Sequence, residues 1–195
     1  MKFSGLATPL RVVLASSGRA DQVAALLSDQ APRLAAALGL PLHTLTPAAC
    51  PHQALHQLEA IVGPWLAALP CDPGLLLEDP ASAATHHWAE ALGAWRQPSL
   101  LLLPADSLAT GAPAATTALL RQWQVPLLGL IQGGGPWEPA RRRSDGLPWI
   151  GWLPEAGRPE AVLSEAAEQE WTEQGMDAMR LSLEARWLQL QAELD

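Results

Sequence analysis

The apolar runs of this chain are continuous rather than alternating, and this feature limits the possible fold more than any other. Residues 99–103 read SLLLL and residues 125–132 read VPLLGLIQ, and a turn and a helical pattern separate the two runs. Strands with apolar residues at successive positions are buried on both faces, which requires a parallel sheet with helices on each side. We therefore predict a three-layer α/β fold with a mainly parallel sheet, and we expect residues 1–195 to form one domain.

Apolar periodicity and turn residues predict the remaining elements. The first helix carries Pro32, which lacks a backbone N–H, so we expect it to be kinked or broken just before that residue. Strands are expected at 10–15, 40–47, 73–79, 99–103, 125–132 and 147–155; helices at 20–38, 51–69, 81–95 and 114–124; loops at 105–111 and 133–146; and a long amphipathic helix or helix pair at 160–195.

Charge and hydropathy exclude two classes of partner. The net charge is -8 and the pI is near 5, whereas a nucleic-acid surface is normally basic. The one basic cluster, Arg141–Arg143, lies in a segment rich in Pro and Gly, which is typical of a solvated turn. Charges, Pro or Gly interrupt every apolar run before the roughly 20 residues that a membrane span needs. The N-terminal residues are typical of a first strand rather than a signal sequence, so we expect a cytoplasmic protein.

The order of elements over residues 74–155 resembles that of dethiobiotin synthetases and the P-loop proteins close to them. The segments that carry the resemblance are PGLLLED, QPSLLLLPADSLATG, PAATTALLRQWQ, VPLLGLIQ and LPWIGWLPE. The resemblance implies a P-loop NTPase-like fold that binds Mg-ATP. It also implies ATP-dependent ligation of a carboxylate to an amine, as in biotin biosynthesis.

The phosphate-binding segment departs from that family. A P-loop reads G-x-x-x-x-G-K-[ST], so that backbone N–H groups surround the phosphates and the lysine neutralises their charge. The segment after the first strand here reads ASSGRADQ, with Gly18 as its one glycine and Arg19 as its one cation. Lys2 is the only lysine of the chain. His43 and Thr46 stand where the resemblance places a second catalytic lysine. We therefore expect a degenerate P-loop.

Candidate ligand-binding residues follow the predicted strands, whose carboxyl ends share one edge of the sheet. Ser16, Ser17, Gly18 and Arg19 precede a helix whose free N–H groups favour an anion. Asp106 follows another strand, together with Ser107, Thr110 and Gly111, which equally suit a turn. The resemblance matches Gln132 to an asparagine that reads the nucleotide base, and it matches Glu78 and Asp79 to an acidic strand end that holds Mg²⁺.

Two other arrangements are open from the sequence. Cys50, His52, His56 and Cys71 suggest a zinc site, because His52 and His56 would share one helix face, although a polar helix face explains them as well. Ser16 or Ser17 after a first strand also fits a serine hydrolase nucleophile.

These patterns give three hypotheses for function. The first is a degenerate dethiobiotin synthetase-like domain that binds a partner protein, a second copy of itself or a small anionic ligand without ATP-dependent catalysis. The second is an active ATP-dependent carboxylate–amine ligase with Mg-ATP as its cofactor, and the third is an unrelated α/β hydrolase. The absence of a P-loop lysine favours the first hypothesis over the second, because phosphoryl transfer would lose the charge that stabilises its transition state.

Overall fold

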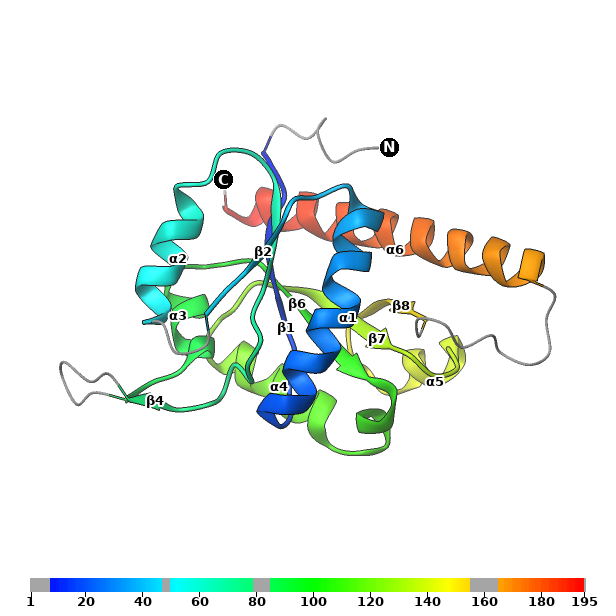
Figure 1. Ribbon diagram of the computed structural model, residues 1–195, viewed down its shortest axis with the longest axis horizontal. Coiled ribbons are helices and arrows are strands. Elements are labelled where there is room, and N and C mark those ends of the chain that lie inside the picture. The colour runs from blue at the N-terminus through cyan, green and yellow to red at the C-terminus, as the bar shows by residue number, and fades with distance from the viewer. Residues whose placement is uncertain (1–7, 47–49, 79–84, 155–164, 195) are drawn as a thin grey trace.

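The computed structural model describes residues 8–46, 50–78, 85–154 and 165–194, with side chains in the last segment described from residue 175. A six-stranded parallel sheet forms its centre, in the order β2-β3-β1-β6-β7-β8 (Figure 1). Its strands are β1 (Arg11–Ala15), β2 (Leu42–Thr44), β3 (Trp65–Ala68), β6 (Ser99–Pro104), β7 (Leu127–Gly133) and β8 (Trp149–Leu153).

Helices cover both faces of this sheet, as the continuous apolar strands predict (Figure 1). One face packs against α1 (Ala20–Leu38) and α6 (Glu165–Leu194). The other face packs against α2 (Pro51–Glu59), α3 (Trp88–Ala94) and α4 (Ala112–Gln122). The predicted three-layer α/β fold is confirmed, and this architecture is consistent with a P-loop-like fold.

The predicted C-terminal helix is confirmed as one continuous helix, α6, over its described part. Four of its side chains, at three- and four-residue spacing, are buried against the sheet. They are Met179, Leu183, Trp187 and Leu190. The β8 residue Gly151 permits close approach of α6, since a Cβ there would lie 2.8 Å from the Cβ of Met179.

The prediction of one helix over residues 51–69 is wrong. α2 ends at Glu59, and residues 65–68 form β3, which lies between β2 and β1 with all four side chains buried. Gly63, with a φ of +92°, turns the chain between the two elements. Tertiary burial in the sheet overrides the helical preference of Leu and Ala in this segment. Val62, which precedes this turn, is 94% exposed.

The predicted strand at 73–79 is not part of the main sheet. Leu77–Glu78 form β4, which pairs antiparallel with β5 (Thr85–His86) in a separate two-stranded ladder. Leu75 and Leu76 beside it are 45% and 65% exposed. This apolar run is therefore peripheral, and β3 is the sheet strand that the expected order lacked. The predicted helix at 81–95 is correspondingly shorter, since α3 begins at Trp88.

Three smaller expectations also change. α1 is not broken, because Pro32 lies inside a helix that continues to Leu38. The loop at 105–111 contains the 3₁₀ helix η2 (Ala105–Ala109), and the loop at 133–146 contains α5 (Pro139–Ser144). Within the part of the chain that the structure describes, no helix combines the length and the apolar character that crossing a membrane requires.

Candidate functional site at the carboxyl edge of the sheet

The loops that follow β1, β3, β6 and β7 lie at one edge of the sheet, because parallel strands all end there. Ser16–Arg19 connect β1 to α1, and Asp72 lies in the loop after β3. Since β1 and β3 are neighbours in the sheet, these two loops are brought together. The candidate residues of the sequence therefore meet an acidic residue that the sequence did not single out.

The backbone N–H of Gly18 donates a hydrogen bond to Oδ2 of Asp72 at 2.9 Å. The other carboxylate oxygen, Oδ1, accepts from the backbone N–H of Gly74 at 2.8 Å. Asp72 is half-buried, and its negative charge lies at the N-terminus of α1, which carries a partial positive charge. A carboxylate of the chain itself thus occupies the position in which a bound anion would accept the Gly18 hydrogen bond.

Arg19 does not direct its charge into this loop. Its guanidinium lies 3.2 Å from the carboxylate of Asp21, and the two side chains are 77% and 67% exposed. An exposed pair of this kind contributes little to stability and is screened by salt. The only cation among residues 16–19 is therefore exposed to solvent.

Ser16 and Ser17 are enclosed where β1 ends. Ser16 is fully buried and Ser17 is 8% exposed, and neither hydroxyl has a hydrogen-bonding partner in the described structure. A hydrolytic serine needs a base within hydrogen-bonding reach and access for the substrate. The described surroundings of these two hydroxyls supply neither feature.

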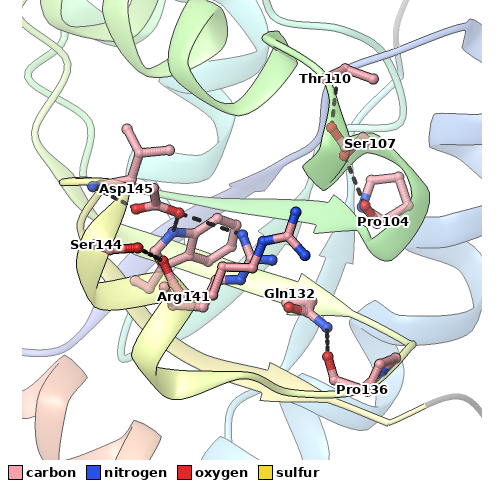
Figure 2. Close-up of polar contacts among 11 residues, drawn as sticks. Pro104, Ser107, Thr110, Gln132, Pro136, Arg141, Ser144 and Asp145 are labelled. Carbon is pink, nitrogen blue, oxygen red and sulfur yellow. Dashed lines mark hydrogen bonds and ion pairs between the residues drawn. The ribbon is translucent and has the colours of Figure 1, made fainter.

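Gln132 lies in β7, one strand further from β1 than β6, and it fixes the glycine-containing loop after its own strand. Its Nε2 donates to the carbonyl oxygen of Gly134 at 2.9 Å. It also donates to that of Pro136 at 2.9 Å (Figure 2). The N–H of Gly134 donates to the carbonyl of Leu153, and the indole of Trp152 donates to the carbonyl of Gly134. The Oε1 of Gln132 is buried without a partner. Its amide donors therefore hold a turn, and its carbonyl oxygen is not engaged.

Asp106 and its neighbours form a capped turn after β6. Ser107 Oγ donates to the Pro104 carbonyl at 2.8 Å, and Thr110 Oγ1 donates to the Ser107 carbonyl at 2.6 Å (Figure 2). Thr110 Oγ1 also accepts from the N–H of Ala112, at the start of α4. Asp106 itself is exposed. The hydroxyls of this segment are used to shape the turn.

The arginine cluster differs from the predicted solvated turn. Arg141 and Arg143 are exposed on α5, but Arg142 is buried. Its Nη1 lies 3.4 Å from Oδ2 of Asp145, and its guanidinium carbon lies 5.2 Å from the centre of the Trp149 ring. Asp145 also accepts from the Trp149 indole at 2.8 Å and from the N–H of Leu147 at 2.9 Å. Arg142 therefore secures α5 against β8.

Among the described residues, the predicted metal ligands are not gathered into one site. Glu78 is exposed in the β4–β5 ladder, outside the main sheet, and Asp79 lies outside the described residues.

The candidate zinc ligands differ in their surroundings. Cys50 is exposed, whereas Cys71 is buried, and burial together with the nearby charge of Asp72 raises the pKa of the Cys71 thiol to about 12. His52 uses Nδ1 to accept from the Trp95 indole at 3.0 Å. Among the described residues no group of three or more His, Cys, Asp or Glu side chains could hold a metal ion.

Asp72 is the residue that sequence reasoning missed. The signal was an acidic residue directly after an apolar run, in LAALPCD, which is typical of the carboxyl end of a sheet strand. The incorrect helix at 51–69 concealed it. Comparison with known proteins supports no assignment for the chain, since no family model matches it and no curated protein matches its sequence.

Proposed function

We propose that this chain is a degenerate P-loop-like domain, similar to dethiobiotin synthetase in the order of its elements, that acts by binding rather than by ATP-dependent catalysis. The contact between Gly18 and Asp72 carries the proposal. A phosphate approaching the N-terminus of α1 meets a carboxylate that already accepts the hydrogen bond of the Gly18 N–H. Two like charges about 4 Å apart near a protein surface repel by roughly 4 kcal/mol.

The scarcity of positively charged side chains near this loop supports the same proposal. Phosphoryl transfer is catalysed mainly by positioning and by charges that stabilise the transition state, and removing one such group typically costs about 3–4 kcal/mol. Lys2 is the only lysine, and Arg19 is exposed beside Asp21. The function that the geometry supports best is therefore the binding of a partner protein or a small ligand.

The experiment is a thermal-shift and calorimetric titration of the full chain with Mg-ATP, Mg-ADP and inorganic phosphate. A ligand present at about 100 times its Kd stabilises a fold by roughly 2.7 kcal/mol, which such a titration detects easily. We expect no stabilisation of the wild-type chain by any of the three. In Asp72→Ala, which frees the Gly18 N–H and removes the negative charge, we expect phosphate to stabilise the fold.

The matched control is Asp21→Ala, which removes a carboxylate close to the same loop without touching the Gly18 hydrogen bond. It should behave as the wild type does. Stabilisation of the wild-type chain by Mg-ATP that disappears in Arg19→Ala would refute the proposal and favour the ligase. Asp72→Ala and Asp21→Ala responding equally to phosphate would show that general charge, rather than the occupied N-terminus, excludes the anion.

A further inference from the structure

A second site of interest lies at the opposite edge of the sheet, where α6 passes the beginning of β7. A cavity of about 380 Å³ is lined there by Pro126, Leu127 and Leu128 on one side and by α6 on the other. This volume falls within the range of small-molecule sites, roughly 300–1,000 Å³. Leu190 completes the apolar part of the lining. The polar part comes from three side chains of α6, which are Arg186, Gln189 and Glu193.

Arg186 is a positive charge held in a partly desolvated place. Its Nη1 donates to the carbonyl of Leu128 at 2.9 Å and to that of Pro148 at 3.3 Å, so the guanidinium is anchored to the sheet. Burial lowers its pKa from the ordinary value, although an arginine stays charged at neutral pH. Among the described residues no carboxylate lies within 4 Å of it. A guanidinium has five N–H donors, so the Nη1 bonds leave others for a ligand.

Glu193 supplies the opposite charge without neutralising Arg186. Its Oε1 accepts from Nε2 of Gln189 at 3.1 Å, which leaves Oε2 for another donor. The two charged residues are seven positions apart, so they share one face of α6 at an axial separation of about 10.5 Å. The carboxyl end of the helix, near Glu193, also carries a partial negative charge. The cavity thus has a positive end and a negative end, separated by more than an ion-pair distance.

We propose that this cavity binds a small zwitterion with an apolar side chain, namely an α-amino acid of the aliphatic class. Its carboxylate pairs with the free donors of Arg186, because a guanidinium recognises a carboxylate through paired hydrogen bonds. Its ammonium group donates to Glu193. Its side chain contacts the leucines that line the cavity. A ligand with only one of the two charges meets an unfavourable charge at the other end of the cavity.

This inference does not rest on the function proposed above, because it uses another edge of the sheet and other residues. Titration with L-leucine tests it, and titration with Mg-ATP and phosphate tests the proposed function, so each can fail separately. The probes are L-leucine, 4-methylpentanoate as the carboxylate alone and 3-methylbutylamine as the amine alone. Binding to the full chain is measured by calorimetry and by chemical-shift perturbation.

We expect saturable binding of L-leucine and at least tenfold weaker binding of both singly charged analogues. Arg186→Gln should raise the Kd for L-leucine at least tenfold. Glu193→Gln should raise it similarly, and because Glu193 is exposed, this variant tests the proposal even if Arg186→Gln fails to fold. The matched control is Arg180→Gln on the same helix, whose guanidinium contacts the Ala37 carbonyl and does not line the cavity.

The control should leave the Kd within twofold of the wild-type value. The proposal is overturned by the absence of saturable L-leucine binding, or by analogues that bind as tightly as L-leucine. It is also overturned if Glu193→Gln has no larger effect than Arg180→Gln.

Discussion

The indole Nε1 of Trp95 donates a hydrogen bond to Nδ1 of His52 at 3.0 Å, and this bond joins the end of α3 to the beginning of α2. Both side chains are half-buried. His52→Ala leaves the indole donor without its partner, so we expect it to lower the free energy of unfolding by about 1 kcal/mol. Urea unfolding measures the change. His56→Ala is the control, because His56 meets the same indole only edge to face, at 6.2 Å between ring centres. A larger loss in the control would contradict this account.

His87 caps the first turn of α3. Its Nδ1 accepts from the backbone N–H of Glu90 at 3.0 Å, although serine, threonine, aspartate and asparagine are the usual residues at such positions. Replacing a cap by alanine typically costs about 1 kcal/mol, so His87→Ala should destabilise the fold by about that amount. His87→Asn supplies an equivalent acceptor and should recover most of the loss in urea unfolding. Equal losses in the two variants would show that the contact of His87 with the Trp123 ring, rather than the cap, matters.

Cys71 should make the fold sensitive to alkali. Its thiol pKa is raised from 9.0 to about 12 in the folded protein, so between these values the unfolded chain loses a proton that the folded protein retains. Stability is therefore unaffected by this group below pH 9 and falls above it, by up to about 1.4 kcal/mol for each pH unit. Unfolding of the wild type and of Cys71→Ala at pH 8 to 10.5 measures the difference. Equal slopes in the two proteins would contradict the prediction.

The same burial predicts unequal reactivity of the two cysteines. A thiol reacts as its thiolate, and Cys71 is 1% exposed as well as hard to ionise, whereas Cys50 is exposed. At pH 8 a chromogenic disulfide reagent should therefore modify one thiol of the native protein rapidly and both thiols in urea. Mass spectrometry of the native product should locate the label at Cys50. Rapid labelling of Cys71 in the native protein would contradict its burial.

Gly93 allows α3 to pack closely against the end of α4, more closely than any other described glycine allows its neighbours to approach. A Cβ at this position of α3 would lie 1.8 Å from the backbone carbonyl oxygen of Trp123, which ends α4. Because the obstacle is backbone, Gly93→Ala should separate α3 from α4 and cost about 3 kcal/mol, at the upper end of ordinary overpacking. Gly111→Ala is the control, since its Cβ would meet no atom within 4 Å. A melting temperature of Gly93→Ala as high as that of the control would contradict the packing.

The layers of the fold could be predicted because a strand that is buried on both faces has apolar residues at successive positions. β6 and β7 have nearly unbroken apolar sequences, and both are fully internal to the sheet. β3 could not be recognised in the same way, because Trp65–Ala68 continue the apolar spacing of the preceding helix. Only the Gly63-Pro64 pair indicated a break. The apolar run at 73–79 led to the opposite error. It predicted a strand of the main sheet, but Leu75 and Leu76 are exposed.

The sequence predicts where the candidate site lies but not which contacts its residues make. Residues 16–19 and Gln132 do lie where strands of the parallel sheet end, as the topology requires. The partner of Gly18 is 54 residues away, and no local pattern connects Gly18 to Asp72. Likewise, the burial of Arg142, unlike its exposed neighbours, depends on its packing against Trp149 of β8. Contacts of this kind depend on tertiary structure, which residue spacing does not encode.

The hydrogen bond from Gly18 to Asp72 also determines how the edge of the sheet responds to the anions of its surroundings. A free phosphate competes at its free concentration, whereas a carboxylate of the same chain competes at an effective concentration that the fold sets. The Gly18 N–H is therefore already paired within the fold, so we expect ordinary variation in phosphate or nucleotide levels to leave this hydrogen bond unchanged. If the proposed function is right, this loop should keep the same conformation whether nucleotide is abundant or scarce.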